Sequence, residues 1–513
     1  MSESSSNNQR IAKNTLLLYF RMLLTMAVSL YTSRVVLQTL GVEDYGIYNV
    51  VGTFVAMFTV LSGSLSAAIS RFLTFELGRK DTDKLKRVFS SAVTIQIVLA
   101  LIIILLAETV GLWFLNHKMV IPIERIEAAN WVYQFSILTF GINLISVPYN
   151  AAIIAHERMS AFAYISILEV LGKLVVAFTI TVAPMDKLVF YGLLLMLIAI
   201  IIRIVYGYYC KKHFKECIFN FLIDKPLLKE MFNFAGWNFF GAASVVLRDQ
   251  GGNVVINLFC GPAVNAARGI SIQVSHAIQG FVSNFMTALN PQITKSYASG
   301  NHDYMMTLIF QGARLSFYIL LILSLPVILN AHYILSLWLG IVPEHTETFV
   351  QLILIFAMSE SLANPLVTAM LATGKIRNYQ LVVGGLQLLN LPISYLFLRM
   401  GYAPECVFIV AIIVSVCCEI ARLYMLHGMI KLPVRNFLYK VYFNVITVSA
   451  IASVLPYLII RRMEENFLNL IWTSLLCVIC TAISVLYIGC NKEERIFVAN
   501  KLQNIKNKIF KKQ

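Results

Sequence analysis

Arginines recur inside long apolar runs of this 513-residue sequence, where a charged side chain is costly and usually faces a cavity or a partner. Four of them lie where snorkelling to the membrane surface does not readily explain them: Arg21, Arg34, Arg248 and Arg268. Placed on helices that line a central gap, these four would make the gap cationic and suited to an anionic ligand. A purely structural role for them stays open. The other three, Arg203, Arg314 and Arg422, are expected to snorkel from run ends, and Arg422 is also expected to pair with Glu419 at i,i+3.

Carboxylates in the same runs are candidates for ion coupling. Glu360 has no basic residue within a helical turn, so it is suited to binding a proton or Na⁺. The alternative is that it only accepts a hydrogen bond from another helix. Asp249 follows Arg248 directly, and because their Cβ atoms point about 100° apart on a helix, we do not expect a simple pair. Glu169 and Lys173 have the i,i+4 spacing of a structural ion pair, with ion coupling by Glu169 as the alternative.

The elements that must carry these side chains are transmembrane helices. The chain is 58% hydrophobic and 13% charged, with a mean hydropathy of +0.75, so the bilayer must solvate most of it. Runs of about 20 apolar residues are long enough to span the hydrocarbon core. The sequence predicts an all-α polytopic membrane protein with about fourteen spans: 13–38, 45–70, 89–113, 127–152, 161–182, 188–210, 231–257, 264–290, 307–330, 347–371, 378–398, 405–427, 441–460 and 467–490.

Charge in the connections predicts the orientation of the chain. About 27 of the 41 Lys and Arg residues fall in the N-terminus, the loops after even-numbered spans and the C-terminal tail, against about 6 in the other loops. The positive-inside rule then places both termini in the cytoplasm. The net charge of +15 is attributed to loops that face anionic headgroups, so no nucleic-acid partner is expected. The basic tail is expected to lie on the membrane as an amphipathic helix.

The two halves of the chain resemble each other. Segment 148–162 aligns without gaps on 365–379, an offset of 217, while Gly41 matches Gly261 at 220 and Gly78 matches Gly300 at 222. An even number of spans per half gives both halves one orientation, related by an axis along the membrane normal. The predicted domains are a polar cytoplasmic leader (1–12), an N-terminal six-helix bundle (13–210), a cytoplasmic linker (211–230), a C-terminal six-helix bundle (231–430), helices 13 and 14 (441–490) and a basic cytoplasmic tail (491–513).

Two segments carry a resemblance to a known family. "LQTLGVEDYGIYNVVGTFVAMFTVLSGSLSAAISRFL" (37–73) resembles the first hairpin of Wzx-type O-antigen and capsule flippases, and "LLKEMFNFAGWNFFGAAS" (227–244) is similar to the start of their second half. These flippases belong to the multidrug/oligosaccharidyl-lipid/polysaccharide exporter superfamily. The likeness also extends to the span number and the six-plus-six-plus-two layout.

The resemblance implies a transporter. Such flippases move undecaprenyl-pyrophosphate-linked oligosaccharides to the outer leaflet of the bacterial inner membrane, and polysaccharide polymerase and ligase partners are implied. Related lipid II flippases keep arginines in spans one, two and eight, and Arg34 and Arg268 would match the first and last of these. The second span has no arginine before Arg71 at its cytoplasmic end, so that part of the pattern is missing. No cofactor or metal is expected, apart from coupling to Na⁺ or H⁺.

Two rival functions are weighed against this one. A cation-coupled drug antiporter of the same superfamily would favour a net-acidic cavity, whereas the spans, without their first residues, hold eight basic residues against five acidic ones. A membrane enzyme that polymerises or ligates glycans would need a sizeable outer loop, and no predicted outer loop exceeds about 16 residues. The composition therefore favours a transporter of anionic cargo over an enzyme.

Overall fold

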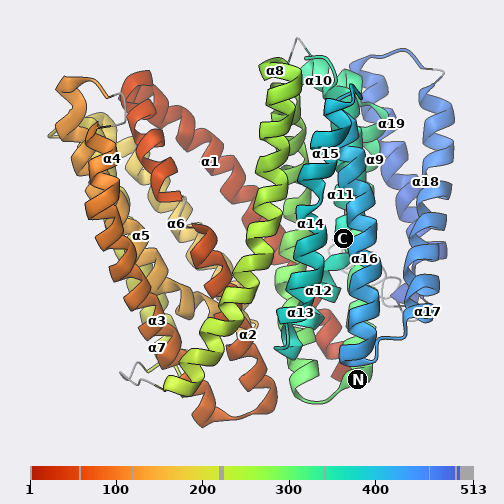
Figure 1. Ribbon diagram of the computed structural model, residues 1–513, viewed down its shortest axis with the longest axis horizontal. Helices are drawn as coiled ribbons and strands as arrows, with labels where there is room; N and C mark the ends of the chain where they lie inside the picture. Colours follow the sequence, from red (N-terminus) through yellow and green to blue (C-terminus); the bar gives the residue numbers. More distant parts are fainter. Residues whose placement is uncertain are drawn as a thin grey trace, which may run out of the picture. The chain divides into compact units, whose positions relative to one another are not determined.

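The chain folds into helices in a computed structural model (Figure 1). The structure describes residues 3–56, 59–117, 121–218, 224–339, 342–461, 463–491 and 494–496, and this part contains no strand. Most of the tail predicted at 491–513 lies outside the described residues. The helices of the first half are α1 (Glu3–Ala56), α2 (Thr59–Arg79), α3 (Thr82–Leu106), α4 (Leu112–His117), α5 (Ile126–Ala155), α6 (Met159–Thr179) and α7 (Lys187–His213). The remaining ones are α8 (Lys225–Ala298), α9 (His302–Leu329), α10 (Ala331–Leu339), α11 (Thr346–Ser361), α12 (Ala363–Thr373), α13 (Arg377–Tyr379), α14 (Gly385–Leu388), α15 (Asn390–Arg399), α16 (Cys406–Ile430), α17 (Val434–Phe437), α18 (Asn444–Ile460) and α19 (Phe467–Ser484).

The predicted membrane class is confirmed. Among the described residues, eleven helical segments are long and apolar enough to cross a membrane. Their surfaces carry large apolar side chains that water would not favour, such as Leu101, Leu105 and Tyr424. The chain is therefore an all-α, multi-pass membrane protein, and the count of fourteen spans remains a prediction.

Two glycines interrupt the longest helices at matching places. α1 is broken at Gly41 (φ 83°, ψ 170°) and α8 at Gly261 (φ 79°, ψ 179°). Both values lie where a residue with a Cβ is strained, and nothing lies within 4 Å of the Cβ position of either glycine. The predicted offset of 220 is thus supported by backbone geometry. Residues 39–44, which separate the predicted spans 13–38 and 45–70, are helical except at Gly41.

The matching turns of the two halves also share backbone geometry. Glu157 and Gly374, which align at the offset of 217, are both left-handed, with φ values of 58° and 75°. The predicted match of Gly78 with Gly300 is wrong by two residues. Gly78 is helical, whereas Lys80, at an offset of 220, shares the positive φ of Gly300 (58° and 77°). A helix C-terminus needs its left-handed residue just beyond the last turn, and that position is Lys80.

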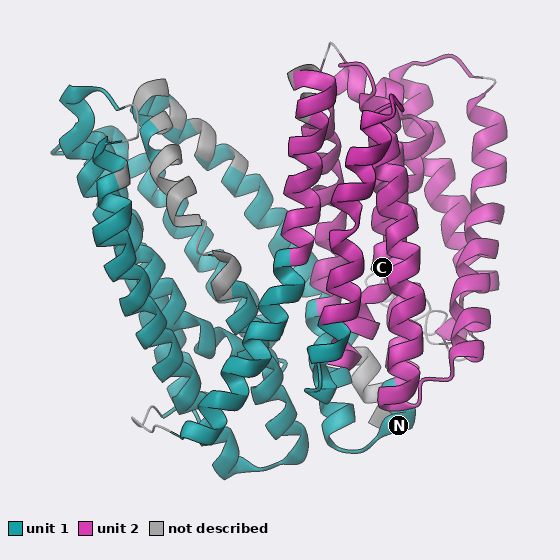
Figure 2. Cartoon of the chain, viewed as in Figure 1, with its two compact units in different colours: residues 1–243, 287–305, 371–380 teal, residues 244–286, 306–370, 381–513 magenta. Residues whose placement is uncertain are grey.

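The described chain forms two compact units (Figure 2). Unit 1 comprises residues 1–243, 287–305 and 371–380. Within it α5 packs against α2, α3 and α7, and α1 packs against α6. Tyr133 is buried in the α5 core and donates to the carbonyl of Ala107 at 2.9 Å. That carbonyl begins a π-helical turn (Ala107–Gly111) and also accepts from the backbone N–H of Leu112.

Unit 2 comprises residues 244–286, 306–370 and 381–513. Its core lies where α11 packs on α16, with the rings of Phe349 and Phe408 4.8 Å apart at their centroids. α15 also packs against α16, and α18 packs against α19. α8 contributes to both units, and the domain limits given above remain a prediction.

Candidate functional site

Acidic and basic side chains alternate across the membrane helices of unit 2, in an arrangement that we call the charge ladder. Arg248 on α8 donates from Nε to Asp249 Oδ1 at 2.9 Å, and its Nη1 lies 4.0 Å from Glu360 Oε2 on α11. Arg422 on α16 lies 4.0 Å from the other oxygen of Glu360 and donates to Glu419 Oε1 at 2.5 Å. Each charge in this ladder therefore has an opposite charge beside it, which offsets the cost of placing it in the membrane.

Glu360 is not the lone carboxylate that its sequence neighbourhood indicated. Ser415 donates to Glu360 Oε1 at 2.5 Å, and the guanidinium groups of Arg248 and Arg422 lie on either side. The alternative reading, a hydrogen bond from another helix, is present. The side chain of Glu360 keeps 24% exposure, so the protein does not fully enclose it. It lies at the centre of a charge network, where gain of a proton or Na⁺ would change the balance of both arginines.

The expectation that Arg248 and Asp249 would not pair is wrong. Their Cβ atoms diverge, but the arginine side chain is long enough to fold back across the helix surface. Asp249 remains 51% exposed, whereas only 11% of the Arg248 side chain is accessible. The ring of Phe356 lies 5.0 Å from the Arg248 guanidinium and covers it.

Arg268 lies in the interior of unit 2. It donates to the side chain of Asn253 and, at 3.0 Å, to the carbonyl of Asp249. Gly252 makes room for it, because a Cβ there would lie 2.8 Å from Nη2. These acceptors are neutral, so they hold the guanidinium without cancelling its charge. The structure thus brings Arg248, Asp249, Arg268 and Glu360 together in unit 2.

The remaining predicted residues belong to unit 1. Arg21 on α1 lies over the ring of Phe162 at 4.5 Å and donates to Ser166 at 3.4 Å, both on α6. The side chain of Arg34 lies outside the described residues. Glu169 pairs with Lys173 at 2.6 Å with both side chains over a third exposed, as expected for the structural ion pair that this spacing predicts. That the arginines of both units line one cavity remains a prediction.

Snorkelling is the wrong explanation for two of the three arginines near predicted run ends. Arg422 is buried in the ladder, and Arg314 on α9 is only 4% exposed. Arg314 donates to the carbonyl of Gly489 at 2.9 Å and to Glu494 at 2.8 Å, and so ties α9 to the end of the last helical segment. Arg203 lies over the ring of Tyr149 at 3.9 Å. Hydropathy could not reveal the contacts of Arg203 and Arg314, because their partners are distant in sequence, whereas the pair of Arg422 and Glu419 has a local i,i+3 spacing.

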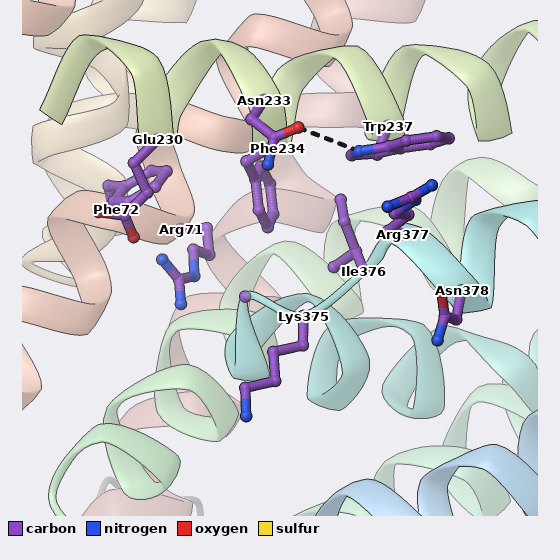
Figure 3. A pocket seen from close by; sticks show the side chains of 11 residues that line it. Arg71, Phe72, Glu230, Asn233, Phe234, Trp237, Lys375, Ile376, Arg377 and Asn378 are labelled. Carbon is purple, nitrogen blue, oxygen red and sulfur yellow. Dashed lines mark hydrogen bonds between the residues drawn. The ribbon is translucent and has the colours of Figure 1, made fainter. Parts of the chain in front are cut away.

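A basic pocket in unit 1 was missed by sequence reasoning (Figure 3). The cavity of about 330 Å³ lies where the end of α2, the start of α8 and the 374–378 segment meet. We call it the Arg71 pocket; its charged and aromatic lining includes Arg71, Glu230, Phe234, Trp237, Lys375 and Arg377. Lys375 could have been noticed, because it stands in the repeated turn at the position of Arg158. The convergence of the three segments could not.

Arg71 is held rigidly at one wall of the Arg71 pocket. It donates to the carbonyls of Leu371 and Ala372 at 3.2 and 3.1 Å, both in the last turn of α12. The rings of Phe72 and Phe75 lie 4.6 and 4.7 Å from its guanidinium. Capping carbonyls with an arginine satisfies them but leaves a full positive charge at the wall of the cavity.

Comparison with known proteins gives two family matches. The family model described as "Polysaccharide biosynthesis protein" matches residues 11–297, and the MatE model matches residues 242–396. The chain is also 21% identical over 322 residues to the uncharacterized membrane protein EpsK of Bacillus subtilis (strain 168). That alignment covers 62% of this chain and 63% of the length of EpsK.

Solved structures share the fold. A MATE structure in the bent conformation superimposes with a TM-score of 0.71 at 13% identity, covering 84% of this chain and 99% of that one. The Vibrio cholerae MATE transporter VcmN in its bent form gives 0.68 at 15% identity, with coverage of 86% and 99%. A transporter from Pyrococcus furiosus, described as having a binding pocket of reverse polarity, gives 0.65 at 15% identity, with coverage of 83% and 96%. At these identities the likeness is one of fold.

Proposed function

Because the chain belongs to the polysaccharide biosynthesis protein family of membrane transporters, we propose that it is a flippase for a polyprenyl-diphosphate-linked oligosaccharide. It moves this lipid from the inner to the outer leaflet of the bacterial cytoplasmic membrane by alternating access. The proposal includes cytoplasmic termini, as the loop charges predict, and a role in making a cell-surface polysaccharide such as O-antigen or capsule. A polymerase and a ligase for the same glycan are the partners that such a product requires.

The observation that carries the proposal is Arg21, a guanidinium inside the membrane segment of α1. Phe162 and Ser166 hold it from α6, within the region that the family model matches. A guanidinium positioned in a low-dielectric segment binds a diphosphate strongly and in a bidentate manner. Arg248 and Arg268 supply the same chemistry in unit 2.

The negative charge of the proposed substrate favours outward transport. An inside-negative membrane potential favours outward movement of an anion by about 2.3 kcal/mol per charge per 100 mV. The diphosphate therefore needs no inward ion to drive it. Coupling to H⁺ or Na⁺ at Glu360 or Asp249 would serve to reset the empty carrier, and the ladder of unit 2 is where that ion would act.

Reconstitution tests the proposal directly. Purified protein in proteoliposomes is given a polyprenyl-diphosphate-linked oligosaccharide, and its appearance on the opposite leaflet is followed by access of an impermeant lectin. We expect translocation by the wild type and a loss of about tenfold or more in Arg21→Ala, with smaller losses in Arg34→Ala, Arg248→Ala and Arg268→Ala. Arg399→Ala, an exposed arginine at the end of α15, is the matched control and should be unchanged. A wild type that moves no glycolipid contradicts the flippase proposal.

The MatE match over 242–396 favours a second candidate, a cation-coupled antiporter of drugs or other small molecules. The exposed Asp249 and the accessible Glu360 are the groups that would meet a cationic load. The same vesicles distinguish the two functions when a cationic dye replaces the glycolipid under an imposed H⁺ or Na⁺ gradient. Gradient-driven dye transport that Asp249→Asn abolishes, without glycolipid movement, selects the antiporter.

A further inference from the structure

The Arg71 pocket has the lining of an anion site. Three cations line it, Arg71, Lys375 and Arg377, against one carboxylate, Glu230. The carbonyls bonded to Arg71 leave its charge in place, and Lys375 and Arg377 are both exposed. The excess of positive charge at the cavity therefore favours a ligand that carries more than one negative charge.

The same pocket also presents an aromatic face and amides. Trp237 donates from its indole nitrogen to Asn233 at 3.1 Å, which fixes the ring, and the guanidinium of Arg377 lies 5.3 Å from that ring. Figure 3 shows the indole and Arg377 on one side of the cavity and Lys375 and Arg71 on the other. A flat indole beside amide groups suits the C–H face and hydroxyls of a sugar, whereas the cations suit phosphate.

We propose that the Arg71 pocket binds the diphosphate and adjoining sugar of a glycosyl diphosphate. Lys375 and Arg377 contact the diphosphate, the rigid Arg71 adds its charge from the wall, and Trp237 packs on the sugar. All of these segments lie at helix ends predicted to face the cytoplasm, where the head group of the lipid is presented before translocation. The choice of ligand rests on the proposed function, while the lining of the pocket includes neither Arg21 nor Arg248.

Binding to the purified full-length protein tests this without any translocation. The probes are inorganic pyrophosphate and the soluble methyl N-acetylglucosaminyl diphosphate, titrated by calorimetry against protein in neutral-lipid nanodiscs. We expect the double variant Lys375→Gln/Arg377→Gln to weaken the binding of both probes by about tenfold or more. Lys187→Gln/Arg399→Gln removes the same charge from exposed sites elsewhere and should change neither. Trp237→Ala should abolish only the advantage of the glycosyl probe over pyrophosphate.

Four results would overturn the proposal. One is equal binding of both probes by wild type and Lys375→Gln/Arg377→Gln. Another is displacement of the glycosyl probe by inorganic sulfate at the same concentration at which pyrophosphate displaces it, which would show that the pocket attracts any anion. The third is loss of binding when the nanodiscs contain anionic phospholipid, which would assign the pocket to a lipid head group. Glycolipid translocation that proceeds normally in Lys375→Gln/Arg377→Gln would leave the flippase standing and reject this site alone.

Discussion

Lys295, in the last turn of α8, pairs with Glu157 in the turn between α5 and α6, with Nζ 2.6 Å from Oε1. The Glu157 side chain is 2% exposed, and it also accepts from Gln292 and pairs with Arg10 at 2.8 Å. One buried carboxylate therefore joins the start of α1, the α5–α6 turn and the end of α8 within unit 1. Gly374 occupies the equivalent turn position in the other half, next to the carbonyls that Arg71 caps.

Replacing the carboxylate should loosen this junction. Glu157→Gln leaves Arg10 and Lys295 close together without a counter-charge, and we expect a loss of about 1–3 kcal/mol of stability because both cations are partly exposed. Lys295→Met should cost less, since Arg10 still neutralises Glu157. The measurement is thermal unfolding in detergent, with the exposed Lys86→Met as control. Equal midpoints for wild type and Glu157→Gln would contradict a stabilising role.

The two interrupting glycines should resist substitution. Gly41→Ala and Gly261→Ala force a Cβ into a left-handed conformation, which costs about 1–2 kcal/mol, although no atom lies near enough to clash. Gly63→Ala and Gly269→Ala are matched controls, because these glycines are helical and equally open. Alanine there should be neutral or slightly stabilising. If all four variants shift the unfolding midpoint alike, the backbone argument fails.

Neutralising Glu360 should uncouple transport from an ion gradient. Glu360→Gln keeps a hydrogen-bond acceptor for Ser415 but cannot exchange a proton or attract Na⁺ between Arg248 and Arg422. We expect the rate of translocation in proteoliposomes to lose its dependence on an imposed H⁺ or Na⁺ gradient. Glu169→Gln alters an exposed i,i+4 pair and should keep most of that dependence. Gradient dependence retained by Glu360→Gln would move the coupling site elsewhere.

Acid should weaken a second junction in unit 1, which Arg125 forms with Asp44 and Asp186. Arg125 donates to Asp44 at 2.7 Å and to Asp186 at 2.6 Å, and Asp186 also caps α7. Burial alone would raise the pKa of Asp186, but the bonds from Arg125 and from the amides of Val189 and Leu188 hold that pKa below its ordinary 3.8. A carboxylate whose pKa is lowered in the folded state stabilises the protein at pH values above its ordinary pKa. This stabilisation is lost as the pH falls through the lowered pKa.

The contribution of Asp186 to the unfolding midpoint should therefore be present at neutral pH and be lost at low pH. We expect Asp186→Asn, which keeps a capping oxygen, to lower the midpoint at neutral pH and to approach the wild type below about pH 4. Glu344→Gln, a change at a 90% exposed carboxylate, should leave the profile unaltered. A constant difference between Asp186→Asn and wild type across this range would exclude titration of Asp186 as the cause.

Much of the fold and part of the candidate site could be read from the residues themselves. Apolar run length predicts a membrane-spanning helix because the bilayer is a local solvent for each segment. Gly41 and Gly261 could be paired from sequence because positive φ is a property of the single residue. The i,i+4 pair of Glu169 and Lys173 is equally local, since both lie on one helix face.

The tertiary structure alone decided what each buried charge contacts. Glu360 has no base nearby in sequence, yet it lies between Arg248 of α8 and Arg422 of α16, because an arginine reaches across a helix interface. Arg71 and Lys375, about 300 residues apart, line one cavity. Local sequence determines where a helix forms and where it breaks. It does not determine which helices pack against each other. For charged side chains in a low-dielectric interior, that packing decides whether they pair, bind an ion or bind a ligand.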